Sequence, residues 1–309
     1  MRALVADPSA SPALALADVP EPTAGPGELL VRVEAASINR GEVRTAARQP
    51  AGKVIGWDVA GTVEAVGEGV ATVVPGDRIV AMSPDGGTFA EKVAVPVEWA
   101  APLVGRADPV VAATLPVAGI TAVGILRLAR TRAGDRVLAT GAAGGVGLLA
   151  VQLAAAEGAT VTGQVSSEAR AGAVRAAGAA EVLIHPGDGG EVPGEYDVIV
   201  DGIGGAMFGP LVRATARRGR FVLYGNSAGG SCTFVPEELY PKGMTVSGFR
   251  VFQSVPPAQG VKDLANLVDL ATNGKLDVRV QATAPLEDAL RLVRDLMDRK
   301  VTGKVVITG

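Results

Sequence analysis

The chain has 309 residues, of which 48% are hydrophobic and 20% are charged, and its formal net charge is −3 at pH 7. This length and apolar content predict a globular protein that is large enough for two domains. The small net charge comes from mixed signs and gives no basic stripe, so the composition argues against nucleic acid as a main partner.

The chain holds one cysteine, Cys232, and one histidine, His185. A usual zinc site needs three or four nitrogen and sulfur ligands, so these two residues predict a protein without a bound metal. We expect His185 to be a solvated residue at a strand end and Cys232 to be an inert, packed thiol. The start of the chain, MRALVADPSA, lacks the sustained apolar segment of a secretory signal, and one cysteine forms no internal disulfide. We therefore expect a cytoplasmic protein.

The first hundred residues predict short strands separated by turns. The segments LLVRVEAASI, GTVEAVGE and GDRIVAM alternate or run apolar, and Pro-Gly and Gly-Gly pairs mark the bends. From about Pro109 helices and strands alternate, which predicts a parallel sheet, and the apolar segment 110–130 is expected to be one long helix. After Phe249 the pattern changes to two amphipathic helices and two short closing strands, VRVQAT and KVVITG.

The most informative segment is VLATGAAGGVGLLAVQLAAAEGATVT, residues 137–162, which predicts a strand, a glycine turn, a helix and a second strand. A helix N-terminus offers unpaired N–H groups, and glycines let a pyrophosphate approach the backbone, so this unit predicts a dinucleotide site. An ordinary glycine-rich loop is the alternative. A membrane span is disfavoured, because the glycines would interrupt the helix near its start. The candidate pyrophosphate-binding residues are Gly141, Ala143, Gly144, Gly145, Val146 and Gly147.

The end of the second strand of this unit reads VTGQVSSEAR and indicates which dinucleotide binds. Gln164 and Val165 stand where an acidic residue would bond the free ribose hydroxyl of NAD. The hydroxyls and the guanidinium that follow suit a dianionic phosphate, so the sequence favours NADPH. The candidate phosphate-binding residues are Ser166, Ser167 and Arg170. The alternative is that Arg170 only pairs with Glu168 or contacts solvent.

Ordered motifs along nearly the whole chain resemble the medium-chain dehydrogenase/reductase superfamily, and within it the zinc-independent NADPH:quinone oxidoreductase branch. These motifs are ASINRGE, GWDVAGTVEAVGEGV, PGDRIV, GGTFAEKVAVP, LPVAGITA, GAAGGVG and GKVVITG. The resemblance implies an α/β protein with a GroES-like β-rich catalytic domain, residues 1–112 and 249–309. It also implies a Rossmann domain with a doubly wound parallel sheet, residues 113–248. Trp57 and Asn39 stand where zinc alcohol dehydrogenases of the superfamily carry metal ligands, so the resemblance implies catalysis without zinc.

By resemblance, the nicotinamide lies between the two domains and three residues are catalytic candidates: Asn39, Arg44 and Thr121. Asn39 would orient the ring or the acceptor oxygen, and its alternative role is a turn asparagine that bonds its own backbone. Arg44 stands where several quinone reductases carry a tyrosine, and it would bind an anionic or phenolic substrate unless its role is only at the surface. Tyr240 is expected to be packed. The resemblance adds, as cofactor-binding residues, Asp201, Gly202, Gly204, Gly225, Asn226, Phe249, Arg250 and Lys304.

Together these features predict an NADPH-dependent oxidoreductase that transfers hydride to a quinone or a related conjugated carbonyl. No proton donor stands out, which a quinone tolerates because water can protonate its reduced oxygen. The alternatives are an enoyl or 2-alkenal reductase of a biosynthetic pathway and a non-catalytic NADPH-binding sensor or structural dimer. The segment MTVSGF is placed by resemblance at the edge of the dinucleotide sheet, which predicts a homodimer formed through this edge.

Overall fold

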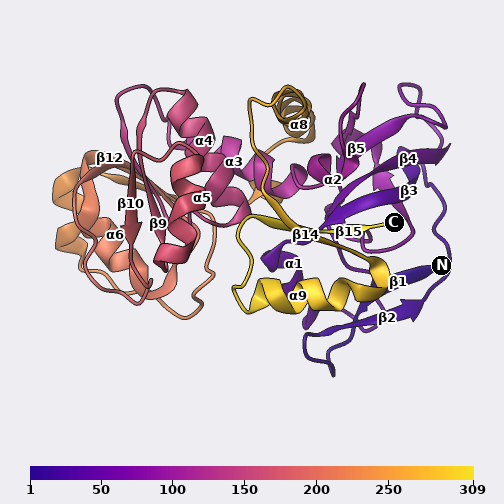
Figure 1. Ribbon diagram of the computed structural model, residues 1–309, viewed down its shortest axis with the longest axis horizontal. Coiled ribbons are helices and arrows are strands. Elements are labelled where there is room, and N and C mark those ends of the chain that lie inside the picture. Colours follow the sequence, from indigo (N-terminus) through magenta and orange to yellow (C-terminus); the bar gives the residue numbers. More distant parts are fainter. The chain divides into compact units, whose positions relative to one another are not determined.

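The computed structural model describes residues 1–309 and divides them into two compact units. Unit 1 consists of residues 1–120 and 255–309, and unit 2 consists of residues 121–254. Both ends of the chain belong to unit 1, so the last 55 residues complete the fold that the first 120 begin (Figure 1).

Unit 1 is built on a seven-stranded sheet in the order β14-β15-β3-β4-β5-β7, with β6 also paired to β3. All its pairings are antiparallel except that of β14 with β15. The strands are β3 (Glu28–Ser37), β4 (Asp58–Val66), β5 (Arg78–Met82), β6 (Lys92–Pro96), β7 (Ala100–Pro102), β14 (Val280–Pro285) and β15 (Lys304–Thr308). A separate antiparallel pair is formed by β1 (Arg2–Ala6) and β2 (Leu14–Asp18). The predicted β-rich domain is therefore confirmed.

The helices of unit 1 pack against this sheet and against its connections. Leu292 and Val293 of α9 (Ala289–Met297) belong to the same buried cluster as the strands, and α9 lies beside β14 in Figure 1. In α8 (Pro257–Thr272) a Cβ on Gly260 would lie 2.7 Å from the Trp99 ring, so only glycine lets the helix pass so close. The remaining helices are α1 (Arg40–Ala46), α2 (Pro109–Ala112) and the 3-10 turns η1 (Val97–Trp99) and η6 (Leu286–Asp288).

The expectation of one long helix over 110–130 is wrong. Helix α2 ends at Ala112, and after three intervening residues α3 (Pro116–Leu128) begins with Pro116 as its first residue. Proline has no N–H, and its ring collides with the preceding turn of a helix, so it is tolerated at a helix start and not in the interior. Residues 116–120 of α3 belong to unit 1, and the rest of this helix belongs to unit 2.

Unit 2 is a six-stranded parallel sheet in the order β10-β9-β8-β11-β12-β13. The strand order reverses between β8 and β11, which is the arrangement of a doubly wound fold. Figure 1 accordingly shows α4 and α5 on one side of β9 and β10, and α6 on the other. The predicted Rossmann-type domain and the α/β fold class are confirmed.

The bounds of the elements of unit 2 follow the predicted alternation of strands and helices. The strands are β8 (Arg136–Ala139), β9 (Thr160–Val165), β10 (Glu181–Ile184), β11 (Tyr196–Asp201), β12 (Thr215–Leu223) and β13 (Thr245–Gly248). The helices are α4 (Gly145–Ala156), α5 (Ala171–Ala176), α6 (Phe208–Ala214), α7 (Val251–Ser254) and the 3-10 turns η2 (Glu168–Arg170), η3 (Gly205–Met207), η4 (Pro236–Glu238) and η5 (Tyr240–Lys242).

Three side chains of unit 2 contradict their predicted exposure. His185 follows β10 as expected, but it is buried, and its Nδ1 accepts a hydrogen bond from the Gly187 N–H at 3.0 Å. Cys232 is exposed rather than packed. Tyr240 is also exposed, at 65%, because it begins the short η5 turn instead of leading into the sheet. No helix of the protein combines the length and the apolar character needed to cross a membrane.

The first turn of helix α1 contains a buried glutamate, Glu42. Asn39 is the N-cap, and the carboxyl group of Glu42 accepts a hydrogen bond from the Asn39 backbone N–H, as in a capping box. The other oxygen of Glu42, Oε2, is buried without a hydrogen-bond partner. Burial, followed by the negative charge of Asp58, raises the pKa of Glu42 well above its usual value of 4.5. The folded state therefore favours the protonated form of this side chain.

We predict that Glu42→Gln makes the protein more stable than the wild type as the pH rises above 4.5. Because folding raises the pKa of Glu42, its contribution to the free energy of unfolding is complete below 4.5 and is lost as the pH rises through the folded-state value. Glutamine does not titrate, so the difference between the two proteins should grow by up to about 1.4 kcal/mol per pH unit in this window.

The measurement is urea unfolding of both proteins at a series of pH values between 4.5 and 8. The control is Glu98→Gln, which removes an exposed carboxylate from the same unit and should follow the wild-type curve. Parallel curves for Glu42→Gln and the wild type would contradict the prediction.

Candidate functional site

The glycine turn of unit 2 has the backbone geometry that a phosphate site requires. Gly144 is the N-cap of α4, and Gly141 has a φ of +57°, in the left-handed region that favours glycine. A Cβ on Gly147 would lie 2.6 Å from the carbonyl oxygen of Gly141, so this glycine lets the helix pack onto the turn. Gly144, Gly145 and Val146 are half-buried, whereas Ala143 and Gly147 are buried. The first N–H groups of α4 have no partner within the helix, which fits the phosphates of a dinucleotide.

A buried glutamine that the sequence analysis did not assign to the site holds this turn in place. Gln164 is 1% exposed, its Oε1 accepts the N–H of Gly141 at 2.9 Å, and its Nε2 donates to the carbonyl of His185. The side chain thereby ties β9 to the glycine turn and to the loop after β10. The signal that could have revealed this role is the long amide side chain of Gln164 in a strand, TVTGQV, whose other residues have small or β-branched side chains.

The predicted phosphate-selecting residues follow directly after β9. Ser166 and Ser167 are exposed, and Ser167 is the N-cap of the η2 turn. Arg170 ends this turn and is half-buried. The carboxylate of Glu168 lies 3.2 Å from Nη1 of Arg175, so Glu168 has a cationic partner other than Arg170. The structure thus brings two hydroxyls and one guanidinium to the carboxyl end of β9.

Asp201 shapes a loop through internal hydrogen bonds. It is fully buried at the end of β11, and its Oδ1 accepts from the Thr140 hydroxyl at 2.5 Å and from the Ile203 N–H at 2.8 Å. Its Oδ2 accepts from the Gly204 N–H at 3.1 Å. Burial raises the pKa of Asp201, and these hydrogen bonds oppose the rise. Asp201 therefore connects the loop after β8 with the loop after β11.

The loops after β11 and β12 pass close to each other because glycines stand at their contacts. A Cβ on Gly225 would lie 2.8 Å from the carbonyl oxygen of Gly202. A Cβ on Gly204, whose φ is +64°, would lie 2.7 Å from Oδ1 of Asn226. The Ser227 N–H donates to the Gly202 carbonyl at 3.1 Å. The structure therefore brings these four candidate residues together at the carboxyl ends of adjacent strands.

The remaining candidates in unit 2 differ in their exposure. Thr121 of α3 is 7% exposed. Phe249 is also 7% exposed, and its ring packs on Gly124 of α3 so closely that an added Cβ would lie 2.3 Å from the ring. Arg250 follows it and is exposed. Phe249 is thus a core residue of unit 2, with Arg250 at the surface beside it.

In unit 1, Asn39 lies between two charged side chains. Its Nδ2 donates to Oδ2 of Asp58 at 2.8 Å, and its Oδ1 accepts from Nζ of Lys304 at 2.6 Å. Asn39 lies between β3 and α1, Asp58 begins β4 and Lys304 begins β15. Lys304, a candidate cofactor-binding residue, therefore contacts Asn39 in unit 1. Arg44 lies in the last turn of α1 and is exposed.

The two charges beside Asn39 are buried and paired with each other. Asp58 is fully buried and Lys304 is 4% exposed, and Nζ of Lys304 is 3.7 Å from Oδ2 of Asp58. Asp58 also accepts hydrogen bonds from the Ser37 hydroxyl at 2.8 Å and from the Val117 N–H at 2.9 Å. Burial raises the pKa of Asp58 and lowers that of Lys304, and the attraction between the two charges opposes both shifts. We conclude that this is a buried ion pair.

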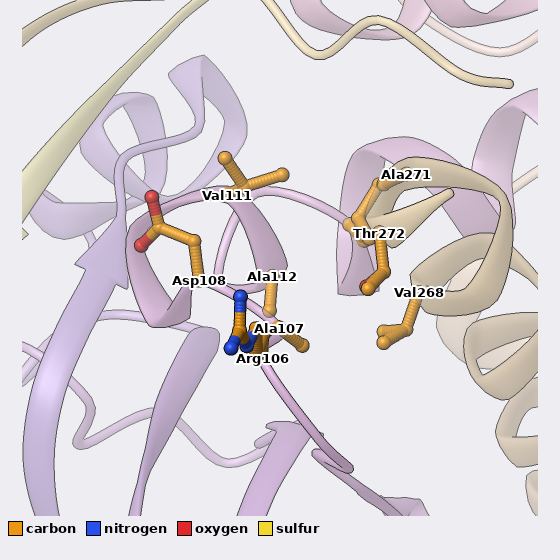
Figure 2. Close-up of a pocket in the computed structure, with 9 residues that line it drawn as sticks. Arg106, Ala107, Asp108, Val111, Ala112, Val268, Ala271 and Thr272 are labelled. Carbon is orange, nitrogen blue, oxygen red and sulfur yellow. The ribbon is translucent and has the colours of Figure 1, made fainter. Parts of the chain in front are cut away.

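Two further features of the structure bear on what this protein binds. The protein brings together no group of three or more His, Cys, Asp or Glu side chains that could hold a metal ion. Unit 1 also contains a cavity of about 210 Å³, which Figure 2 shows with Val268, Ala271 and Thr272 of α8 facing the α2 segment. This volume is below the roughly 300 Å³ of a typical ligand pocket, and no predicted site residue lines it.

Two family models match the chain. The model described as alcohol dehydrogenase GroES-like domain matches residues 25–105, in unit 1. The model described as zinc-binding dehydrogenase matches residues 145–273, which include most of unit 2.

Curated proteins and solved structures are similar to the chain over nearly its whole length. Prostaglandin reductase-3 of Bos taurus is 30% identical over 94% of this chain and 83% of its own length. Acryloyl-coenzyme A reductase of Sulfurisphaera tokodaii is 27% identical over 99% of both chains. The structure of Escherichia coli quinone oxidoreductase complexed with NADPH is 25% identical with a TM-score of 0.90, and the match covers 100% of this chain and 99% of that one. The chain therefore belongs to the medium-chain dehydrogenase/reductase superfamily and is an NAD(P)-dependent oxidoreductase.

Proposed function

We propose that the protein is a zinc-independent, NADPH-dependent reductase that transfers hydride to a quinone or a related conjugated carbonyl. Unit 2 would bind the dinucleotide, and Asn39 in unit 1 would donate a hydrogen bond to the carbonyl oxygen of the acceptor. The observation that carries this proposal is the amide of Asn39, which is held between a buried lysine and a buried aspartate where a metal-dependent relative has ligands. The single cysteine fits the reducing cytoplasm, the compartment that we propose.

The residues present in unit 2 fit a nicotinamide dinucleotide. The turn from Gly141 to Gly147 would hold the pyrophosphate, and the loops that contain Gly202, Gly204 and Gly225 lie at the same edge of the sheet. When bound, this cofactor supplies the hydride. The preference for NADPH rests on Ser166, Ser167 and Arg170, which offer donors to a phosphate. It also rests on Gln164 and Val165, which stand where an NAD-binding protein would carry an acidic residue.

The absence of zinc from the proposed mechanism rests on the chemistry of the side chains. Asn39 and the half-buried Trp57 occupy the positions that match metal ligands in zinc-dependent relatives, and an indole offers no ligand to a metal. Asp58 lies next to these two positions, but its oxygens already accept from Ser37, Asn39 and Val117. The negative charge that develops on the acceptor oxygen would therefore be stabilised by hydrogen bonding.

A specific observation favours a second candidate, an enoyl reductase. One similar protein is an acryloyl-coenzyme A reductase, and an acryloyl group is a carbon–carbon double bond conjugated to a carbonyl. Quinones share this conjugation, so hydride addition to either acceptor places negative charge on a carbonyl oxygen. The two candidates differ in the proton that follows. A reduced quinone can take it from water, whereas stereospecific reduction of an enoyl group usually needs a positioned acid.

We predict that the wild-type protein oxidises NADPH faster with quinones than with enones or enoyl thioesters, and that the quinone rate depends weakly on pH. The measurement is the initial rate of NADPH oxidation with each acceptor between pH 5.5 and 8.5. Faster reduction of an enone, with deuterium from labelled NADPH on one face only and a sharp titration of the rate, would replace the quinone assignment with the enoyl one. A protein that binds NADPH but turns over no acceptor would be a non-catalytic NADPH-binding protein.

The matched control for this assay is Gly144→Val. The φ of Gly144 is −83°, and an added Cβ would meet only the Gly141 carbonyl oxygen, at 3.3 Å, so the fold should tolerate the side chain. The added methyl groups would stand at the start of α4 and obstruct the phosphates. Loss of NADPH binding and of activity in a cooperatively folded variant is the expected result.

We predict that Arg170→Ala raises the KM for NADPH about tenfold or more and leaves the KM for NADH nearly unchanged. A charge-assisted hydrogen bond to the additional phosphate of NADPH contributes about 1.5 to 3 kcal/mol, and NADH has no such group. The control is Arg175→Ala, which removes an exposed guanidinium that pairs with Glu168 and should affect both cofactors little. An equal loss of affinity for both cofactors in Arg170→Ala would refute the assignment.

We also propose that two copies of the chain pair through the exposed edge of the unit 2 sheet. Strand β13 is the last strand of this sheet, and Val246 at its centre is 38% exposed. Other large apolar side chains of the preceding segment are exposed as well: Phe234 at 38%, Val235 at 51% and Tyr240 at 65%. An unpaired apolar edge strand favours pairing with its twin, which would make one continuous sheet through both subunits.

We predict a dimer at micromolar concentration and a monomer for Val246→Lys, because a lysine on each of two paired edges places like charges together. The measurement is the molar mass from light scattering. The control is Val104→Lys, which adds the same charge at a 68% exposed valine of unit 1 and should stay dimeric. A monomeric wild type, or a dimeric Val246→Lys, would disprove this mode of pairing.

A further inference from the structure

We propose that Lys304 and Asp58 are a pair of positioning residues that fix which way the side-chain amide of Asn39 points, so that its second N–H faces the acceptor oxygen. This inference rests on the proposed reductase function, because it gives Asn39 its partner in the reaction. It assigns to Lys304 a role that acts through Asn39 and involves no contact with the cofactor.

The two charges recognise opposite ends of the amide. The Lys304 ammonium is a donor only, and it lies 2.6 Å from Oδ1 of Asn39. The Asp58 carboxylate, an acceptor only when ionised, lies 2.8 Å from Nδ2. Turning the amide over would set its N–H groups against the ammonium and its oxygen against the carboxylate. Only one of the two orientations therefore satisfies both partners.

The side chains of Lys304 and Asp58 are themselves held in place by further hydrogen bonds. Nζ of Lys304 also donates to the carbonyl of Ile38 at 3.3 Å, and Asp58 is held by the Ser37 hydroxyl and the Val117 N–H. Both charged side chains are buried, so neither finds water as an alternative partner. The fixed positions of the two charges are therefore imposed on the amide between them.

Asn39 is the member of the three that an acceptor can reach. Lys304 and Asp58 are at most 4% exposed, whereas Asn39 is half-buried at the start of α1. An asparagine amide carries two N–H donors, and the bond to Asp58 uses one of them. The second N–H keeps a defined direction, because the first is fixed. Because this N–H already points in a fixed direction, no free energy is spent on reorienting it when negative charge develops on the acceptor oxygen.

The first test is the double variant Lys304→Met with Asp58→Asn. It removes both charges together, so no unpaired charge remains buried, and the new amide at position 58 can donate to Oδ1 of Asn39. We expect a folded protein whose kcat falls at least about tenfold while its KM for NADPH stays within about twofold. A kcat within twofold of the wild type would overturn the proposal.

The matched control removes another partly buried ion pair, Asp135 with Arg220 of unit 2, which lie 2.9 Å apart. The double variant Asp135→Asn with Arg220→Met should keep the wild-type kcat at a temperature where it is folded. An equal fall of kcat in this control would show that loss of any buried pair lowers turnover, and it would also overturn the proposal.

A second variant keeps the buried charges and removes only the donor. Exchanging two side chains, Asn39→Asp with Asp58→Asn, leaves one carboxylate beside Lys304 and one amide beside Ser37 and Val117, so the fold should persist. Position 39 then has no N–H, and we expect kcat to fall at least about tenfold. Wild-type turnover in this folded variant would mean that Asn39 has only a structural role, and the proposal would fail.

A spectroscopic readout separates this inference from the proposed function. In protein labelled with 15N-asparagine, the Asn39 side-chain proton that bonds Asp58 should exchange with water much more slowly than the other one, and the difference should become clearly smaller in Lys304→Met with Asp58→Asn. If the wild type reduces no acceptor, the proposed function fails, while this signal still reports whether the pair fixes the amide. An Asn39 signal that is identical in the two proteins would overturn the inference even where the enzyme is active.

Discussion

The ion pair between Lys304 and Asp58 connects the two ends of the chain that form unit 1. Strand β15 pairs antiparallel with β3, with Val306 opposite Ser37, and this register carries Lys304 to Asn39 across 265 residues of sequence. A buried charge that loses its partner costs several kcal/mol, so the sheet, the start of β4 and the start of α1 are all held to the same geometry. The position of the candidate catalytic amide therefore depends on the closing strand of the fold.

In unit 2 the candidate site consists mainly of backbone, so its geometry depends on the conformation of the loops. Glycines give the loops room to approach one another, but glycine alone leaves a loop free to adopt many conformations. Buried polar side chains remove that freedom: Gln164 bonds the first glycine of the turn, and Asp201 joins Thr140 to the loop after β11. The sheet supplies the position of these loops, and their shape comes from hydrogen bonds that the solvent does not reach.

The fold could be read from the sequence because its signals are local. The apolar strands, the glycine turn and the amphipathic helices each repeat with the period of their structure, and their order indicates a β-rich domain and a parallel sheet. The sequence predicts one helix over 110–130, and the structure divides it before Pro116. Proline is a local signal for a helix start, but the continuous apolar residues on both sides favoured a single helix. The roles of Glu42, Gln164 and Lys304 were not predictable in the same way. Each depends on partners that only the folded chain brings together, just as Asn39 and Asp58 are in contact although they are 19 positions apart in the sequence.

The charges around Asn39 also bear on which acceptors the site suits. Lys304 and Asp58 compensate each other, so this pair presents no net charge to the acceptor. A zinc ion would stabilise even a localised alkoxide through its own charge, whereas one amide N–H offers a weaker, dipolar interaction. Reduction of a conjugated carbonyl spreads the negative charge over several atoms, so its transition state needs less electrostatic stabilisation from the site. We therefore propose, on grounds independent of the similar proteins, that unit 1 suits a conjugated acceptor better than a simple ketone or aldehyde.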